Sequence, residues 1–317
     1  MIEILDTDVA VAALAPEWAA LWSRCPDATP FQSPHWLLPW WCAFGTGLPR
    51  VALERRGGAV VGILPLYVLS GERKALPIGA GTSDYLDGLG DPAPLLPALL
   101  DRLRADPVDH VDLIETPPWS RLLGLPGVTW TPGSPCPVLT LADIPSGIRR
   151  KLRMSRHRAE RAGGWAVETA TADTLDADLD MLIRLHQGRW TAQGEPGVLA
   201  DPAVLSFWRD AAQGLLAAGS LRLQLLRVGG VVAASIMALL SPGRIFFYLS
   251  GYDPAQAFVS PGTLLLGAML EQATAEGRVE AHFLRGQESY KYAWGAVDRW
   301  NAAGRPAPLS SSDLTFT

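Results

Sequence analysis

The stretch Val228-Gly229-Gly230-Val231-Val232-Ala233-Ala234 decides the fold of this chain. Paired glycines between apolar runs favour a tight β-turn, so the stretch predicts a hairpin with strands at Leu221 to Val228 and Val231 to Leu240. The first half of the chain carries an echo of it, Arg56-Gly57-Gly58-Ala59-Val60-Val61-Gly62. In each half one more strand, a helix and another strand follow the hairpin. We therefore predict a duplicated α/β unit.

The periodicity of the rest of the chain is that of a mixed α/β protein. In the first half we expect helices at Pro16 to Arg24, Pro34 to Phe44 and Ala93 to Arg104, and strands at Val51 to Glu54, Ala59 to Leu69, Ala75 to Gly81 and Val108 to Glu115. The prolines between Pro117 and Pro137 predict a loop-rich end to this half. In the second half we expect helices at Ala177 to Trp190, Asp201 to Gly219 and Thr263 to Ala275, and strands at Trp165 to Thr169, Ile245 to Leu249 and Val279 to Leu284.

Composition excludes several classes of protein. The chain has 317 residues, enough for two domains, and its formal net charge of -5 argues against binding nucleic acid through overall charge. The three scattered cysteines, Cys25, Cys42 and Cys136, indicate neither a zinc site nor a disulfide framework, so we expect no metal. The N-terminus lacks the features of a signal peptide, and no apolar stretch reaches the roughly 18 residues of a membrane-spanning helix. We therefore expect a cytoplasmic protein without a membrane span.

Residues Ser146 to Arg161 break this composition with seven cations in thirteen residues, from Arg149 to Arg161. Ser146 can cap a helix here, and Gly163-Gly164 can end it. Like charges on one helix repel one another unless anions answer them. Two interpretations stay open, a solvated linker helix on an acidic face, or a phosphate site for a nucleotide-linked substrate, CoA or tRNA.

The densest chemistry lies in Phe283-Leu284-Arg285-Gly286-Gln287-Glu288-Ser289-Tyr290-Lys291-Tyr292-Ala293-Trp294-Gly295. An apolar strand runs straight into cations, a carboxylate and three aromatic residues. Ligands of open α/β sheets sit beyond the carboxyl ends of strands, so this segment predicts a substrate or acyl-donor pocket. A surface ion pair with aromatics capping the core is the alternative.

A second candidate site precedes the predicted helix at Thr263 to Ala275. Ser260-Pro261-Gly262 places a serine at the N-cap and a proline at the first helical position. The free N–H groups of a helix N-terminus attract anions, so a phosphate could bind here. An ordinary capped helix explains the same residues.

The order of these elements resembles the core of GNAT acyltransferases, and the details look like the CelD-like branch, which is related to the two-lobed Fem peptidyltransferases. The stretches that carry the resemblance are Phe31-Gln32-Ser33-Pro34-His35-Trp36, Ser83-Asp84-Tyr85-Leu86-Asp87, Lys151-Leu152-Arg153, Arg156 to Glu160, Leu185-His186, Arg189-Trp190, Tyr248-Leu249-Ser250-Gly251-Tyr252-Asp253, Ser260-Pro261-Gly262 and Phe283 to Gly295.

This resemblance implies two tandem GNAT-like lobes, each a mixed, mostly antiparallel sheet flanked by helices. We expect an acceptor-side lobe at 1–145, a basic linker helix at 146–164, a donor-side lobe at 165–305 and a flexible tail at 306–317. It also implies that Lys291 stabilises the oxyanion and that Asp84 contacts the acceptor. Tyr252 and His186 are further candidates for handling the acceptor proton. The expected donor-binding residues are Ser260, Gly262, Thr263, Arg285 and Tyr248, and the expected substrate-binding residues are Tyr85, Arg153, Arg156, Arg189, Trp190, Glu288, Tyr290 and Trp294.

One departure concerns the donor. The pyrophosphate loop of GNAT enzymes has the form Q/R-x-x-G-x-G/A, whereas Gln256 to Gly262 holds one glycine, and Pro261 removes an N–H donor. The leading prediction is an acyltransferase that moves an acyl group, with acetyl expected, from acyl-CoA to an amine or hydroxyl of a saccharide or small molecule. The alternatives are a Fem-like transferase that uses aminoacyl-tRNA, and a non-catalytic protein that binds a saccharide or envelope precursor, as the twelve tryptophans could.

Overall fold

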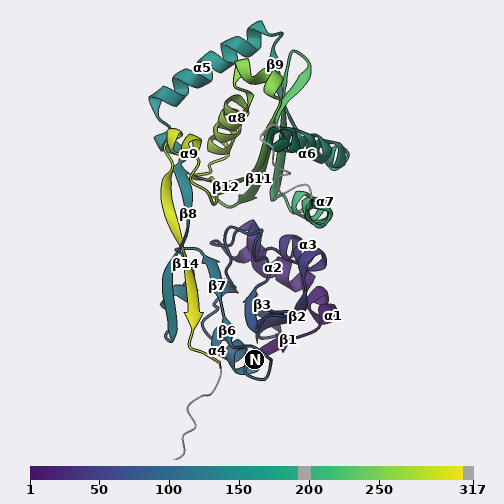
Figure 1. Ribbon diagram of the computed structural model, residues 1–317, viewed down its shortest axis with the longest axis vertical. Coiled ribbons are helices and arrows are strands. Elements are labelled where there is room, and N and C mark those ends of the chain that lie inside the picture. Colours follow the sequence, from purple (N-terminus) through teal and green to yellow (C-terminus); the bar gives the residue numbers. More distant parts are fainter. Residues whose placement is uncertain (192–200, 310–317) are drawn as a thin grey trace, which may run out of the picture. The chain divides into compact units, whose positions relative to one another are not determined.

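The chain folds into two units in a computed structural model (Figure 1). The structure describes residues 1–191 and 201–309, and for residues 189–191 it describes the backbone alone. Unit 1 comprises Met1–Ser134 with Trp300–Thr317, and unit 2 comprises Pro135–Arg299. The chain leaves unit 1 within strand β8 (Val128–Thr140) and returns within β14 (Val297–Pro306). The basic segment therefore lies inside unit 2.

Unit 1 is built on a mostly antiparallel sheet. Its strands are β1 (Ile2–Leu5), β2 (Gly47–Arg56), β3 (Ala59–Leu69), β4 (Lys74–Pro77) and β6 (His110–Val111) in that order, with β5 (Leu89–Gly90) paired to β3. Only the pairing of β4 with β6 is parallel among these. The helices are α1 (Asp8–Ala13), α2 (Ala15–Arg24), α3 (Pro34–Phe44) and α4 (Leu95–Leu103). β7 (Leu113–Thr116) pairs antiparallel with β14.

The two faces of the β2–β3 hairpin pack against different helices. Leu64, Leu66 and Val68 belong to one buried cluster with the leucines of α4. Tyr67 points to the opposite face, because side chains alternate along a strand, and its ring lies against Trp40 and Trp41 of α3. The tryptophans near the N-terminus are thus mainly core residues.

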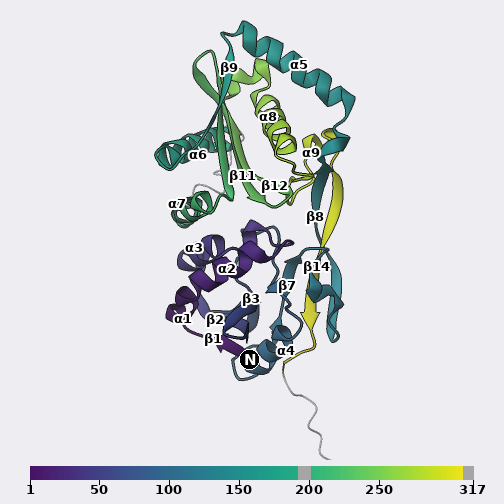
Figure 2. The same ribbon diagram turned by 180° about the vertical axis from the view of Figure 1, so that it is seen from behind.

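The other sheet has eight strands and begins with β7, β14 and β8. Its remaining strands lie in unit 2, in the order β13 (Glu280–His282), β12 (Arg244–Tyr252), β11 (Val231–Ser241), β10 (Leu221–Val228) and β9 (Trp165–Thr169). Its pairings are antiparallel except for β12 with β13. Helices α5 (Ser146–Arg161) and α8 (Pro261–Ala275) cover one face, and α6 (Leu175–Thr191) and α7 (Pro202–Ala217) cover the other (Figure 2). The short helix α9 (Ser289–Ala293) precedes β14.

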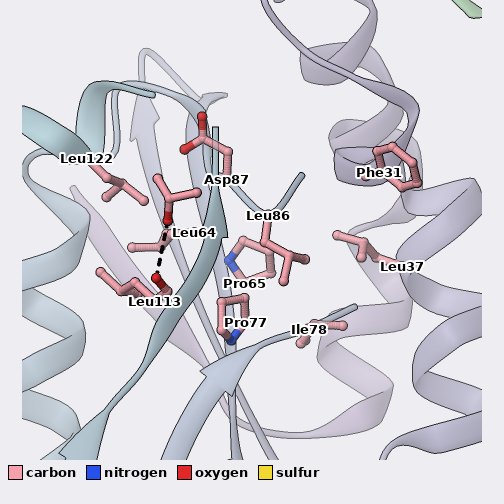
Figure 3. A pocket seen from close by; sticks show the side chains of 11 residues that line it. Phe31, Leu37, Leu64, Pro65, Pro77, Ile78, Leu86, Asp87, Leu113 and Leu122 are labelled. Atoms are coloured by element: carbon pink, nitrogen blue, oxygen red, sulfur yellow. Dashed lines mark hydrogen bonds between the residues drawn. The ribbon is translucent and has the colours of Figure 1, made fainter. Parts of the chain in front are cut away.

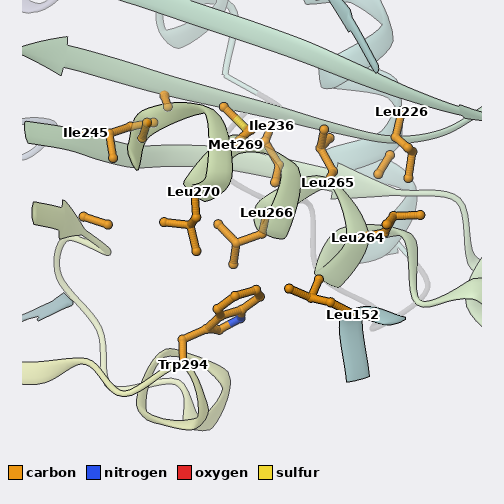
Figure 4. Close-up of a cluster of buried hydrophobic side chains, with 14 of the residues drawn as sticks. Leu152, Leu226, Ile236, Ile245, Leu264, Leu265, Leu266, Met269, Leu270 and Trp294 are labelled. Carbon is orange, nitrogen blue, oxygen red and sulfur yellow. The ribbon is translucent and has the colours of Figure 1, made fainter. Parts of the chain in front are cut away.

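The core of unit 2 on the α8 face is aliphatic and includes one tryptophan. Leu152 of α5, Leu266 of α8 and Trp294 meet there (Figure 4). α5 approaches α8 so closely that a Cβ on Gly267 would lie 2.3 Å from Leu152 Cδ2. The aliphatic face of α5 is therefore fixed to unit 2, and its opposite face carries the cations.

The two hairpins are alike in detail. Gly57, Gly58, Gly229 and Gly230 all have positive φ, as a type I′ turn requires. In both hairpins one residue is bulged out, Val61 in the first and Ala233 in the second, each three positions after the second glycine. The predicted mixed α/β class with two helix-flanked sheets is confirmed.

Several local expectations differ from the structure. The residues expected as one strand from Val108 to Glu115 form β6 and β7, which belong to different sheets. The stretch expected as loop from Pro117 to Pro137 holds most of β8, a strand that includes Pro132, Pro135 and Pro137. Helix α5 begins at Ser146 with Pro145 at the N-cap and no side-chain cap.

Candidate functional site

The parallel strands β12 and β13 of unit 2 stop pairing at Phe246 and His282. Immediately afterwards β12 carries a bulge, because Ala238 of β11 opposes Phe247 while Met237 opposes Leu249. Tyr248 is the extra residue, and its ring lies 4.6 Å from that of Trp208 in α7. A bulge disrupts the regular hydrogen-bond ladder, and this one lies just past the end of the β12–β13 pairing, where that edge of β12 is no longer paired with β13. The carboxyl ends of β12 and β13 are therefore a candidate ligand site.

The loop after β13 is held by Lys291. Its side chain is 3% exposed, and Nζ donates to the carbonyl oxygens of Arg285 at 2.7 Å and Gly286 at 3.0 Å, with a longer contact to that of Leu284. Nζ also lies 2.9 Å from Glu288 Oε2. Leu284 has φ 61° and Gly286 has φ 101°, both in the left-handed region. The ammonium group thus fixes a loop whose backbone is strained at a non-glycine residue.

The other residues predicted in this segment have separate environments. Trp294 is 3% exposed and belongs to the aliphatic core. Tyr290 is 46% exposed, with its ring edge-on to that of Phe283. Arg285 is half-buried and Glu288 is exposed. Trp294 is therefore a core residue in position, whereas Tyr290, Arg285 and Glu288 stand around the loop where a ligand could reach them.

A buried histidine ends β13, and sequence analysis did not single it out. His282 Nε2 lies 3.2 Å from Glu280 Oε2, and Arg299 pairs with the same carboxylate. Burial lowers the pKa of His282 to about 4. The hydrogen bond from His282, assisted by Arg299, lowers the pKa of Glu280 to about 2. The sequence places His282 in an apolar strand, and its burial and its pairing with the partly exposed Glu280 are seen only in the structure.

The N-terminus of α8 follows a strained residue. Ser260 has φ 53° and ψ 59°, and its hydroxyl does not cap the helix. Gly262 and Thr263 are partly exposed, and a Cβ on Gly262 would meet no atom within 4 Å. Ser260 is thus the N-cap residue, as predicted, but its side chain makes no capping hydrogen bond. The first N–H groups of α8 lack the side-chain acceptor that a capping serine would supply.

On the opposite face of the sheet, α6 lies against β12. His186 is 8% exposed, and its Nδ1 lies 2.9 Å from the carbonyl oxygen of Ser250. A Cβ on Gly251 would lie 2.5 Å from the backbone nitrogen of His186. Tyr252, at the end of β12, is partly buried against the core. The side chains of Arg189 and Trp190 lie outside the described residues.

The cations of α5 fall into two groups. Arg156 pairs with Glu271 of α8 and lies over the ring of Trp165, while Arg158 donates to the carbonyl oxygen of Phe258. Arg153 is exposed, with four further basic residues of this helix, Arg149, Arg150, Lys151 and Arg161. Within the described residues, Arg156 is the one cation of α5 that forms an ion pair with a carboxylate. The helix therefore combines a docked aliphatic face with an exposed basic face.

Two of the predicted residues lie in unit 1. Asp84 is 7% exposed, and its carbonyl oxygen accepts a 2.8 Å hydrogen bond from Asn301. Tyr85 is fully buried, with its ring 5.1 Å from that of Trp119 and its carbonyl bonded by Gln32. Its burial places Tyr85 among the core residues of unit 1.

The second carboxyl group of the same segment, Asp87, was missed. Its Oδ1 accepts hydrogen bonds from Ser120 Oγ at 2.7 Å and from the Gly88 amide at 2.8 Å. Burial raises the pKa of Asp87 to about 7. On one side lies an apolar cavity of only about 10 Å³, too small for more than one water (Figure 3). The sequence signal was present, since Asp87 stands in the same quoted stretch as Asp84.

No group of three or more His, Cys, Asp or Glu side chains gathers as metal ligands within the described residues. Across the same residues, none of the helices combines the length and apolar character needed to cross a bilayer.

Comparison with known families assigns the second half of the chain. Residues 146–292 match the family model described as an acetyltransferase (GNAT) domain. No curated protein matches the chain in sequence at a significant level. The matched residues include α5, the bulge at Tyr248, the N-terminus of α8 and Lys291. Residues 146–292 thus match a GNAT-type acetyltransferase domain, which confirms the wider part of the predicted resemblance.

Solved structures share the fold along almost the whole chain. FemX superposes with a TM-score of 0.67 and 11% identity over 96% of this chain and 96% of its own. The C-terminal domain (DUF2156) of a protein assigned as a lysylphosphatidylglycerol synthetase, from Agrobacterium fabrum, gives 0.65 and 12% over 96% and 94%. L-PGS from Bacillus licheniformis gives 0.57 and 14% over 81% and 84%. At these identities the likeness concerns the fold, and the CelD-like branch stays a prediction.

Proposed function

We propose that this protein is an acyltransferase that moves an acyl group, acetyl in the first instance, from acyl-CoA to an amine or hydroxyl of a saccharide or small-molecule acceptor. The observation that carries the proposal is the match of residues 146–292 to an acetyltransferase (GNAT) domain. The same residues hold the end of the β12–β13 pairing, the bulge and the open start of α8.

The donor would bind along β12 toward α8. An extended, amide-containing arm can hydrogen-bond to a strand edge that has left its ladder, and β12 leaves its ladder with β13 after Phe246. The phosphates would then meet the N–H groups of Gly262 and Thr263 at the positive end of the α8 dipole. Ser260 adds a hydroxyl that the helix itself does not use. Tyr248 and Arg285 stand at the two strand ends as further donor contacts.

The reaction would be a direct attack. The acceptor nitrogen or oxygen adds to the thioester carbonyl carbon, the C–S bond of the tetrahedral intermediate breaks, and the CoA thiolate leaves and takes up a proton. Asp84, His186 or Tyr252 would handle the proton of the acceptor, and of these the Asp84 carboxylate and the His186 imidazole can receive it directly. Lys291 would stabilise the oxyanion only by exchanging one of its present carbonyl bonds, so its first role is to position the loop from Leu284 to Glu288. Glu288, Tyr290, Arg153 and Arg156 are the remaining proposed acceptor contacts.

The test is thermal unfolding with titrated acetyl-CoA, CoA and a longer acyl-CoA, because a ligand of the native state raises the melting temperature. The variant Gly262→Asp places a carboxylate at the helix start, where a Cβ meets no atom within 4 Å, and Gly262→Ala is its uncharged control. We expect Gly262→Asp to weaken CoA binding at least about tenfold through charge repulsion, while Gly262→Ala retains it. No shift of the wild type by any CoA species would overturn the proposed donor.

The basic face of α5 favours a second candidate, a transferase that takes its acyl group from aminoacyl-tRNA. Within the described residues, only Glu271 forms an ion pair with a cation of this helix. Its exposed cations could therefore bind a run of phosphates. This candidate predicts tRNA binding that falls steeply with salt and is lost when Lys151 and Arg153 are both replaced by glutamate. Binding that ignores salt, or survives this double variant, counts against it. Absence of any donor binding would leave the non-catalytic precursor-binding protein.

A further inference from the structure

Unit 1 contains a second cavity beside Asp87, and neither the proposed donor site nor the predicted acceptor residues account for it. Its volume is about 220 Å³, larger than the roughly 150 Å³ cavity known to hold benzene. It is formed where α2 ends, where the chain leaves the buried Ser83–Asp87 stretch, and where Trp119 and Arg121 pass by. A ligand of amino-acid size fits this volume.

The carboxyl group of Asp87 is only half satisfied by the protein. Oδ1 receives both donors, Ser120 Oγ and the Gly88 amide. Oδ2 receives no hydrogen bond from the described residues, and the group points away from the leucines that line the small apolar cavity (Figure 3). Asp87 lines the larger cavity as well, so Oδ2 is available to a ligand there.

The rim of the cavity carries charges of both signs. Asp27 is exposed, and its charge acts on Asp87. Arg24 and Arg121 are exposed too. The Arg24 guanidinium group donates to the Val60 carbonyl oxygen, and that of Arg121 has no hydrogen bond to the described residues. Two carboxyl groups without a cation attract an ammonium group, and two guanidinium groups without an anion attract a carboxylate.

We propose that this cavity binds a small zwitterion of the amino-acid class, with its ammonium group beside Asp87 and Asp27 and its carboxylate at Arg24 and Arg121. The side wall formed by Trp119 and Leu89 covers the apolar part of the ligand. The inference rests on unit 1 alone and needs no acyl donor, so it stands or falls separately from the proposed transferase activity.

Binding should depend on pH through Asp87. Its pKa of about 7 reflects burial and the nearby charge of Asp27, and an ammonium group would lower that pKa. The ligand therefore requires the ionised carboxyl group. Affinity should fall about tenfold per pH unit below 7 and level off above it.

Cys25 offers a direct readout, since it lines the cavity and is partly exposed, whereas Cys42 is exposed on α3 and lies outside the cavity. The rate of iodoacetamide alkylation at both cysteines is measured by mass spectrometry with 5-aminopentanoate, pentylamine or pentanoate added to the full chain. We expect 5-aminopentanoate to slow the alkylation of Cys25 at least about fivefold relative to Cys42, and each single-charge analogue to do so less.

The variant Asp87→Asn keeps an oxygen for Ser120 and Gly88 and should lose the protection of Cys25, with its fold checked by thermal unfolding. Loss of protection in that variant and weaker protection at pH 6 than at pH 8 support the proposal. Equal alkylation of Cys25 with all three compounds, or equal protection by pentylamine or by pentanoate, overturns it. So does protection that persists in Asp87→Asn.

Discussion

Lys291 in unit 2 and Asp87 in unit 1 are both ionisable groups set into the protein, and their surroundings differ. The ammonium of Lys291 meets three carbonyl oxygens and the carboxylate of Glu288. Asp87 has two donors on Oδ1 and, within the described residues, none on Oδ2. A charged group whose hydrogen bonds are all made to the protein holds the backbone in place. A charged group with an unused acceptor can still form a hydrogen bond to a ligand.

The backbone near each group agrees with this difference. The loop that Lys291 holds includes Leu284 at φ 61°, a conformation that a branched residue adopts only under constraint. Asp87 is followed by Gly88, whose amide bonds the carboxyl group without positive φ. The lysine maintains a strained loop, and the aspartate sits on a relaxed one. Removing each group should therefore have opposite effects on stability.

Replacing Lys291 with methionine should have the largest effect. The side chain keeps its length, but three carbonyl groups and Glu288 lose their donor, and breaking one partner of a buried charged network costs about 3–5 kcal/mol. We expect the free energy of unfolding of unit 2, measured by urea titration, to fall by about that amount. Lys151→Met, on the exposed face of α5, is the matched control and should change stability by less than about 0.5 kcal/mol.

Activity separates the two roles of Lys291. If it only positions the loop, Lys291→Arg, which retains a cation and several donors, should recover stability and turnover together. If it also stabilises the oxyanion, Lys291→Arg should recover stability and leave turnover low. A Lys291→Met variant as stable as the wild type would show that the carbonyl bonds do not hold the loop.

Replacing Asp87 with asparagine should stabilise unit 1. The folded pKa of about 7 lies above the ordinary value, so the folded state holds a proton that the unfolded state releases between pH 4 and 7. The native carboxyl group therefore loses stability as pH rises through this range, and the variant should gain about 2–4 kcal/mol at pH 8 and little at pH 4. Hydrogen exchange of unit 1 peptides, followed at both pH values, measures the gain. A gain that is the same at both would assign it to packing.

His282 in unit 2 should respond to pH with the opposite sign. Its folded pKa of about 4 lies below the ordinary value, so stability is present above pH 6.5 and is lost as pH falls toward 4, by about 3 kcal/mol at most. The lowered pKa of Glu280 extends the loss toward pH 2. Exchange of unit 2 peptides should therefore quicken between pH 6.5 and 4, and His282→Gln should flatten that change. A profile that His282→Gln leaves unaltered would contradict the assignment.

Much of the fold followed from local chemistry. The paired glycines predicted both hairpins, and the caps and prolines placed α3 and α8 within two residues of their observed bounds. The β8 strand was missed because prolines usually indicate a loop, and β8 contains three of them, Pro132, Pro135 and Pro137. The break between β6 and β7 was missed because alternation says nothing about which sheet a strand joins.

The site was less predictable than the fold. Residue types identified the segment around Lys291, yet only the folded loop shows that its ammonium group is already bonded to nearby carbonyl oxygens. Trp294 and Tyr85 were expected at a substrate and are buried in the cores of their units. Asp87 and His282 acquire their shifted pKa values from burial, which a single sequence does not display.

The smallest predicted effect concerns Ser260, the strained residue before α8. At φ 53° a side chain costs about 1 kcal/mol that glycine does not incur, so Ser260→Gly should be more stable than Ser260→Ala by about that amount in urea unfolding. Both variants lose the hydroxyl, and both should bind acetyl-CoA more weakly if that hydroxyl contacts a phosphate. The strained backbone at Ser260 would then serve donor binding, whereas the strained backbone at Leu284 belongs to the loop that Lys291 holds. Equal stability of the two variants would show that the left-handed conformation costs nothing here, and undiminished binding would remove Ser260 from the donor site.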